Sequence, residues 1–223
     1  MLCCGGDGTL LEGIHRLSDR SIPVAAINFG HLGFLSSATR DGVEALFEDI
    51  ANNRLNIQPR SMLEISGIDA AEGTVTALNE VAAQRAEATM IKVEAKVNSQ
   101  LVAQYNGDGV ILSTPTGSTA YSLSAGGPII YPQADVFVLT AVAPHSLNVR
   151  PIVIADNKAI ELHIESRSGS FLVAVDGISR SYPEHTTLTL RKAEHTIRVV
   201  KKEGNTFFHT LQKKMMWGTD PRQ

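Results

Sequence analysis

A glycine-rich turn near the start of the chain, Gly5-Gly6-Asp7-Gly8-Thr9, carries groups that suit phosphoryl chemistry. Three glycines in four residues let a backbone approach a ligand closely. The N–H groups of such a turn, placed at the start of a helix, suit phosphate oxygens. Asp7 is the one carboxylate of the turn. A second interpretation stays open here, in which the turn joins a strand to a helix and Asp7 caps that helix.

A second segment with chemical potential is rich in hydroxyl groups. Seven hydroxyl side chains, one of them a tyrosine, lie within residues 113–122, after an apolar run at 110–112. Small hydroxyls can form hydrogen bonds with ribose, phosphate or amide groups, and Tyr121 could stack on a base. A Ser/Thr-rich turn with a helix cap is the alternative interpretation.

Several common sites are excluded by their missing motifs. The chain has no G-x-x-x-x-G-K-[ST] loop and no G-x-S-x-G elbow. A dinucleotide G-x-G-x-x-G fingerprint is absent, because Leu11 stands where the third glycine would be. No pair of Cys or His residues has the spacing of zinc ligands, so we predict no metal held by a dedicated protein cage.

The elements expected to position these residues differ between the two ends of the chain. Through about residue 55 the pattern is α/β: helical spacing at 10–17, a buried strand at 23–27, a loop at 30–35, and a helix after an Asp41 N-cap. Beyond Pro59 the pattern is mostly β. Strand-like alternation or β-rich runs occur at 91–97, 159–164, 171–175, 187–190 and 196–200. Helices are expected after Gly117 and over 207–215.

The predicted fold is therefore a truncated, Rossmann-like α/β domain followed by a larger β-sandwich-like domain. Residues 1–57 with 206–223 form the first domain, and residues 58–205 form the second. The last helical segment is expected to pack back on the first domain.

Composition limits the class of protein. The 223 residues are 43% hydrophobic and 19% charged, which is typical of globular chains. The net charge of −3 and the scattered basic residues argue against nucleic-acid binding. No apolar run approaches the ~18 residues of a membrane span, and no signal-peptide pattern is present. The adjacent Cys3 and Cys4 exclude a disulfide framework and are expected to be buried, so we predict a cytoplasmic protein without a membrane partner.

Taken together, the motifs resemble the NAD kinase family, and the resemblance covers essentially the whole chain. The matching pieces are residues 5–11, Leu32-Gly33-Phe34-Leu35, Asn79-Glu80, 107–128, Pro144-His145-Ser146-Leu147 with Arg150-Pro151, and Asp176-Gly177. Similar Gly-Gly-Asp-Gly turns occur in lipid kinases and phosphofructokinases. The combination of residues 108–128 with Asn79-Glu80 is specific to NAD kinases.

The resemblance implies a role for each matching residue. Asp7 is the implied catalytic base that accepts the proton of the ribose 2′-hydroxyl. Gly5, Gly6 and Thr9 are implied to form the phosphate loop. The implied substrate-binding residues are Gly8, Asn79, Glu80, Asn106, Asp108, Thr119, Ala120, Tyr121, Ser122, Leu123 and Ser124. Asn106 departs from many relatives, and Asp176-Gly177 matches the family without an assigned chemical role.

The implied reaction transfers the γ-phosphoryl group of ATP, or of a polyphosphate, to NAD and gives NADP. A divalent cation, Mg²⁺ or alternatively Mn²⁺, is implied as cofactor, and the implied assembly is a homodimer or homotetramer. Two alternatives stay open: a lipid or sphingoid kinase with the same turn, and an inactive NAD(P)-binding module. Relatives carry a longer segment before the turn, whereas four residues precede it here. We therefore expect the affinity for ATP to be reduced more than the affinity for NAD.

Overall fold

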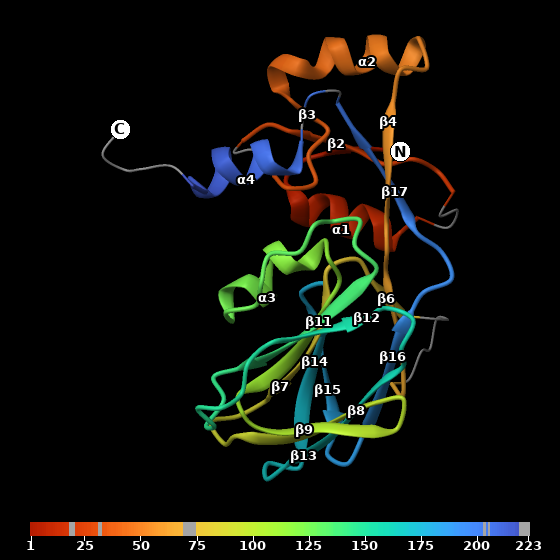
Figure 1. The fold of residues 1–223 in the computed structure, drawn as a ribbon. Coiled ribbons are helices and arrows are strands. Elements are labelled where there is room, and N and C mark those ends of the chain that lie inside the picture. The colour runs from red at the N-terminus through yellow and green to blue at the C-terminus, as the bar shows by residue number, and fades with distance from the viewer. Residues whose placement is uncertain (18–20, 31–32, 69–74, 203, 205, 219–223) are drawn as a thin grey trace. The chain divides into compact units, whose positions relative to one another are not determined.

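The computed structural model describes residues 1–17, 21–30, 33–68, 75–202, 204 and 206–218. The chain forms two compact units (Figure 1). The α/β unit comprises Met1–Arg60 with Thr196–Gln223, and the β unit comprises Ser61–His195.

The α/β unit is built on a small parallel sheet of order β1-β2-β3. Its elements are β1 (Leu2–Cys4), α1 (Asp7–His15), β2 (Ala25–Asn28), β3 (Ala38–Thr39), a 3₁₀ turn (Arg40–Gly42), α2 (Val43–Ala51), β4 (Asn56–Arg60), β17 (Ile197–Lys201) and α4 (Phe207–Met215). All four residues of β2 are buried, as the apolar run at 23–27 predicted. The helices bury Leu10 and Ile14 of α1 and Leu46 of α2.

One capping prediction in this unit is wrong. Asp41 does not cap α2, because it lies inside the 3₁₀ turn that precedes the helix. The N-cap of α2 is Gly42, which has no side chain to form a cap hydrogen bond. At the other end of the chain, α4 is capped by Thr206, whose hydroxyl accepts a hydrogen bond from the His209 N–H at 3.1 Å.

The second crossing between the units lies at 195/196, ten residues before the expected position. The reason is the pairing of β17, which runs antiparallel to β4 from Ile197↔Arg60 to Lys201↔Asn56. Val199 of β17 also forms a parallel bridge with Val24. The 196–200 run was correctly predicted as a strand, but its partners place it in the α/β unit. The helix α4 belongs to the same unit, where Phe207 lies 6.4 Å from the Phe34 ring.

The β unit contains two six-stranded sheets, with orders β12-β11-β10-β7-β14-β15 and β6-β5-β16-β13-β8-β9. Its strands are β5 (Leu63–Ser66), β6 (Val75–Ala77), β7 (Glu80–Arg85), β8 (Ile91–Val97), β9 (Gln100–Gly107), β10 (Gly109–Ser113), β11 (Val136–Val142), β12 (Ile152–Ala155), β13 (Ile160–Ser166), β14 (Ser170–Val175), β15 (Ile178–Pro183) and β16 (Thr187–Lys192). A 3₁₀ turn (Gly117–Thr119) and the one-turn helix α3 (Tyr121–Ser124) complete the unit.

Alternating side chains from the two sheets form one core. Ile91, Val93 and Ala95 of β8 are buried in it, as the alternation at 91–97 predicted. Large side chains such as Phe137 and Phe171 fill the core from the other sheet. This part of the fold is therefore the predicted β sandwich.

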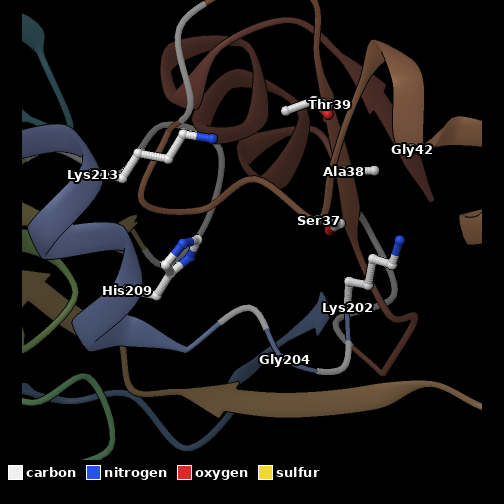
Figure 2. Close-up of a pocket in the computed structure, with 8 residues that line it drawn as sticks. All are labelled: Ser37, Ala38, Thr39, Gly42, Lys202, Gly204, His209 and Lys213. Atoms are coloured by element: carbon white, nitrogen blue, oxygen red, sulfur yellow. The ribbon is translucent and has the colours of Figure 1, made fainter.

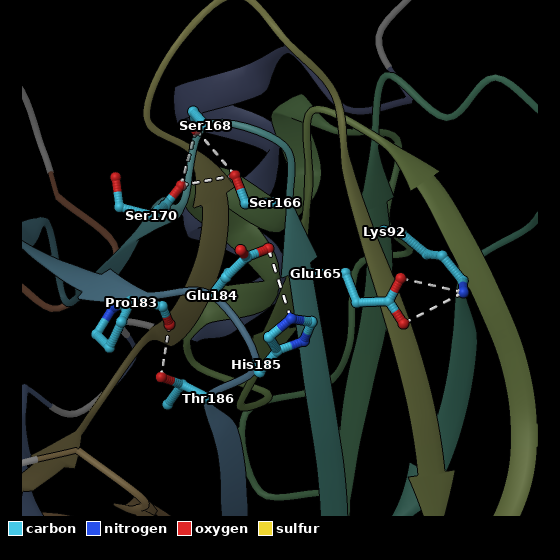
Figure 3. Close-up of polar contacts among 9 residues, drawn as sticks. All are labelled: Lys92, Glu165, Ser166, Ser168, Ser170, Pro183, Glu184, His185 and Thr186. Carbon is cyan, nitrogen blue, oxygen red and sulfur yellow. Dashed lines mark hydrogen bonds and ion pairs between the residues drawn. The ribbon is translucent and has the colours of Figure 1, made fainter.

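Polar contacts fasten the exposed ends and faces of these strands (Figure 3). The turn between β13 and β14 is closed by the Ser166 and Ser168 hydroxyls, which donate to the Ser170 carbonyl at 2.7 and 3.1 Å. Lys92 of β8 pairs with Glu165 of β13 at 3.3 Å. Such exposed pairs contribute little to stability, so the strand positions depend mainly on the core.

The expectation for the two cysteines is half right. Cys3 is buried and Cys4 is exposed, because successive strand side chains point to opposite faces. Burial raises the pKa of the Cys3 thiol. Within the described residues, no helix is long and apolar enough to cross a membrane.

Candidate active site

The glycine turn joins β1 to α1 in the α/β unit. The Gly5 N–H donates to the Ile27 carbonyl at 3.0 Å, which ties the turn to β2. A Cβ at Gly5 would lie 2.3 Å from Thr9 Oγ1, so this position has no room for a side chain. By contrast, Gly6 and Gly8 face open space. The backbone at Gly6 and Gly8 is therefore accessible to a ligand, as a phosphate-binding turn requires.

Asp7 is the first residue of α1, and its side chain caps no helix end. Its carboxylate accepts hydrogen bonds from the Phe34 N–H (3.0 Å) and the Leu35 N–H (3.2 Å). Gly33 makes this approach possible, because a Cβ there would lie 2.1 Å from Asp7 Oδ1. The side chain keeps 29% exposure, and Lys214 Nζ lies 3.8 Å from Oδ2. Asp7 is thus a held, partly exposed carboxylate. Leu32, from the same motif, lies outside the described residues.

A cavity of about 260 Å³ opens elsewhere in the α/β unit (Figure 2). Its basic lining comes from Lys202, after β17, and from Lys213 of α4. Figure 2 shows Lys213 and the His209 ring projecting from that helix. These three side chains are exposed. The cavity therefore adds positive charge to the unit that holds Asp7.

In the β unit, three neighbouring strand ends bring the predicted Asn79-Glu80 pair into a buried corner. Glu80 begins β7 and lies opposite Ser113, the last residue of β10. Val81 lies opposite Val175, the last residue of β14. Asn79 is 9% exposed and Glu80 is 8% exposed. Because antiparallel strands alternate in direction, the start of β7 meets the ends of both neighbours.

The Asn79 backbone is packed against the hydroxyl-rich segment. The Asn79 carbonyl accepts a hydrogen bond from the Thr114 N–H at 2.8 Å. The Thr114 hydroxyl donates to the Leu78 carbonyl at 2.5 Å. A Cβ at Gly117 would lie 2.1 Å from the Asn79 carbonyl oxygen, so only glycine permits this close approach.

Asp176 holds the other side of the same corner, a role that its sequence motif does not indicate. Its carboxylate accepts three backbone N–H groups, from Leu78 (2.7 Å), Asn79 (2.8 Å) and Glu80 (3.1 Å). Asp176 and Gly177 have positive φ values of 46° and 87°, which shape the turn between β14 and β15. The match of Asp176-Gly177 to the family was the available signal that this residue matters. Its partners could not be predicted, because they lie about a hundred residues away in the sequence.

Glu80 is chemically perturbed at this corner. Burial, and secondarily the negative charge of Asp176, raise the pKa of the Glu80 carboxyl to about 7. Its buried Oε2 has no hydrogen-bond partner among the described residues. A buried carboxyl with an open oxygen is suited to bind a polar ligand group.

The raised pKa of Glu80 predicts a pH-dependent stability. The folded state binds an extra proton between the ordinary carboxyl pKa of 4.5 and about 7. The stabilisation is therefore complete below pH 4.5 and is lost as the pH rises through 7. We expect Glu80→Gln to be more stable than the parent at pH 8 by roughly 3 kcal/mol, with the difference vanishing towards pH 4.5. Urea unfolding across this range measures it, and parallel curves for the two proteins would contradict it.

The hydroxyl-rich segment divides into structural and accessible groups. Ser118 donates to the Pro115 carbonyl at 2.7 Å, and Ser122 shares a hydrogen bond with Thr140 at 3.1 Å. Ser122, predicted to bind substrate, is buried with its hydroxyl engaged, because the single turn of α3 directs it inward. The other predicted residues here, Thr119, Ala120, Tyr121, Leu123 and Ser124, are partly or fully exposed. Tyr121 OH accepts from Gln84 Nε2 at 2.6 Å.

Asp108 directly precedes β10, at the opposite end of β7 and β10, whereas Asn106 lies on β9 of the other sheet. Asp108 pairs with Arg85, the last residue of β7, at 3.1 Å. Asn106 is exposed on β9, and its carbonyl accepts the His145 N–H. β7 begins at Glu80 and ends at Arg85, so about 17 Å of strand separates the two ends. The structure thus groups Asn79, Glu80 and Thr114, and it leaves Asp108 apart from them.

No group of three or more His, Cys, Asp or Glu side chains that could hold a metal ion occurs in the described ranges.

The α/β unit carries a glycine turn and a held aspartate, and the β sandwich carries a buried polar corner. These features are those expected of a two-domain kinase with a Gly-Gly-Asp-Gly turn. The family models for the ATP-NAD kinase N-terminal and C-terminal domains match residues 1–55 and 78–202. The chain belongs to the NAD kinase family.

Individual relatives agree with this assignment. A NAD kinase of Bacteroides fragilis is 46% identical over 100% of this chain and 77% of its own length. A NAD kinase of Porphyromonas gingivalis is 42% identical, with the same shares of both chains. Among solved structures, yeast NADH kinase complexed with NADH has a TM-score of 0.90 at 27% identity, covering 98% of this chain and 66% of its own. An Archaeoglobus fulgidus NAD kinase in complex with ATP has a TM-score of 0.84 at 29% identity, covering 96% of this chain and 82% of its own.

Proposed function

We propose that this chain transfers the γ-phosphoryl group of ATP to the 2′-hydroxyl of the adenosine ribose of NAD and so produces NADP. The observation that carries the proposal is the Asp7 carboxylate, held by two backbone N–H groups beside an open glycine turn in a member of the NAD kinase family. The structural relatives were solved with NADH in one case and ATP in the other, which supports a dinucleotide acceptor and an ATP donor.

The proposed step is an in-line displacement at the γ-phosphorus. The ribose 2′-oxygen forms a bond to phosphorus while the bond from phosphorus to the β,γ-bridging oxygen breaks, and ADP leaves. The 2′-hydroxyl proton passes to the Asp7 carboxylate, which acts as general base. The N–H groups of the turn at Gly6–Gly8 provide local positive potential for the transferred group. A bound Mg²⁺ or Mn²⁺ supplies further neutralisation of the donor phosphates.

Formation of NADP from NAD, ATP and Mg²⁺ tests the proposal directly, with polyphosphate as a second donor. Parallel reactions with diacylglycerol as acceptor test the lipid-kinase alternative, which no observed feature favours. Calorimetric binding of NADP without turnover would instead identify a binding module. The proposal also includes a cytoplasmic location, which the composition and the cysteines favour, and a homodimer or homotetramer, which the resemblance implies.

Two substitutions test the NAD-binding assignment in the β unit. We expect Asn79→Ala and Tyr121→Ala each to weaken NAD binding more than ATP binding, because a lost polar partner costs roughly 1–3 kcal/mol. Calorimetry with each nucleotide measures the two affinities. Leu101→Ala is a matched control, since Leu101 is 53% exposed on β9 in the other sheet. Equal losses for both nucleotides would indicate a disrupted unit and would contradict the assignment.

A further inference from the structure

Lys201, the last residue of β17, is a buried cation that the mechanism above does not use. The residue is 6% exposed, although lysine is almost never fully buried without a partner. Its ammonium donates hydrogen bonds to the Phe34 carbonyl at 2.7 Å and to the Ser36 carbonyl at 3.0 Å. The partners of this buried ammonium are thus main-chain oxygens of the loop that follows Gly33.

The same loop holds Asp7 from its other side. The Phe34 and Leu35 N–H groups donate to the Asp7 carboxylate at 3.0 and 3.2 Å. The Phe34 carbonyl and the Leu35 N–H belong to one peptide group, so a single peptide links the ammonium to the carboxylate. Hydrogen bonds in such a chain polarise and strengthen one another. The cation therefore acts on Asp7 through the backbone without touching it.

A separate set of hydrogen bonds anchors the loop to its surroundings. The Ser37 hydroxyl donates to the Val200 carbonyl and accepts from the Ala26 N–H at 3.0 Å. The Gly33 N–H donates to Ser36 Oγ at 3.0 Å. These neutral contacts fix the loop between β2 and β17, so the contribution of the Lys201 charge can be separated from that of anchoring alone.

We propose that Lys201 is a positioning residue for the phosphoryl transfer: its charged ammonium orients the peptides of residues 34–36, which hold the Asp7 carboxylate ready to accept a proton. The proposal rests on the proposed function. It predicts that the protonation state of Lys201 controls turnover and leaves the binding of NAD largely unchanged.

The charges around Lys201 make its protonation state sensitive to pH near neutrality. Burial, and secondarily the positive charge of Arg60 on β4, lower the pKa of the Lys201 ammonium to about 7, while Asp7 on α1 opposes the shift. Lys214 on α4 lies beyond Asp7, at 3.8 Å from its carboxylate. As the pH rises through about 7, Lys201 loses the positive charge that its ammonium presents to the loop carbonyls.

The test compares Lys201→Gln, Lys201→Arg and the control Ser37→Ala. The parent kcat is expected to fall as the pH rises from 6 to 9. Lys201→Gln should lower kcat at pH 6 on the order of 10-fold and leave the KM for NAD unchanged. The kcat of this variant should not fall further between pH 6 and 9. Lys201→Arg keeps its charge and should retain its pH 6 rate at pH 9. Ser37→Ala should lose stability but keep the parental pH profile. A Lys201→Gln protein with the parental kcat and profile would overturn the proposal.

An NMR titration makes the test independent of turnover and of the arginine variant. The Leu35 amide ¹⁵N shift of the parent is expected to titrate near pH 7, and in Lys201→Gln that titration should disappear. A titration that persists in Lys201→Gln, or a flat parental shift, would overturn the link from Lys201 to Asp7. Failure of the parent to form NADP would instead overturn the proposed function, and the amide titration would still report on the loop.

Discussion

Asp7→Asn is expected to lower kcat by roughly 10²–10⁴-fold, because the change removes a general base while keeping the size of the side chain. The KM for NAD should stay close to that of the parent, since the predicted dinucleotide contacts from Asn79 onward lie in the β unit. Steady-state rates of NADP formation with saturating ATP measure both quantities. The asparagine carbonyl can still accept one of the two loop N–H groups, so the loop at Phe34 and Leu35 keeps a partner.

Asp41→Asn provides the matched control, because Asp41 is an exposed carboxylate in a 3₁₀ turn of the same unit. The control should retain the parental kcat. Thermal unfolding of both variants separates a loss of chemistry from a loss of structure. A fully active Asp7→Asn protein would mean that Asp7 serves the loop only, and the proposed mechanism would be wrong.

The sequence predicted those elements whose signal is local. The alternation at 91–97 identified β8, because it reflects the burial of one face, and the apolar spacing at 207–215 identified α4, which buries Leu211. The position of β17 needed information that its own residues do not carry. Its partners are β4 and Val24, which lie far away along the chain. Asp41 failed as a cap because a 3₁₀ turn moved the N-cap by one residue, to Gly42.

The candidate site was predictable in its residue types and unpredictable in its supports. The Gly-Gly-Asp-Gly turn marks Asp7, but the N–H groups that hold it are 27 and 28 residues away. The raised pKa of Glu80 depends on burial at a corner of three strand ends. Ser122 looked like one hydroxyl among seven, and its burial and its contact with Thr140 show that it faces inward. Support of this kind arises from tertiary packing, which residue spacing along the chain does not encode.

Asp176→Asn is expected to weaken NAD binding on the order of 10²-fold, which corresponds to about 2.7 kcal/mol. The carboxylate accepts three N–H groups, from Leu78, Asn79 and Glu80. The asparagine amide has one oxygen to offer, so at least one N–H loses its partner, and each such loss costs roughly 1–3 kcal/mol. The peptides that orient the predicted dinucleotide contacts would then relax.

A second readout distinguishes positioning from general damage. Asp176 helps to raise the pKa of Glu80, so its neutralisation should move the pH dependence of NAD binding to lower pH. Calorimetric titrations with NAD between pH 5 and 8 measure the affinity and its pH dependence together. Asp135→Asn is the control, since that side chain is 87% exposed and pairs with Lys192 at 3.3 Å. Parental affinity and pH dependence in Asp176→Asn would show that the corner holds its shape without this carboxylate. A lower affinity with an unchanged pH dependence would instead assign Asp176 to stability alone.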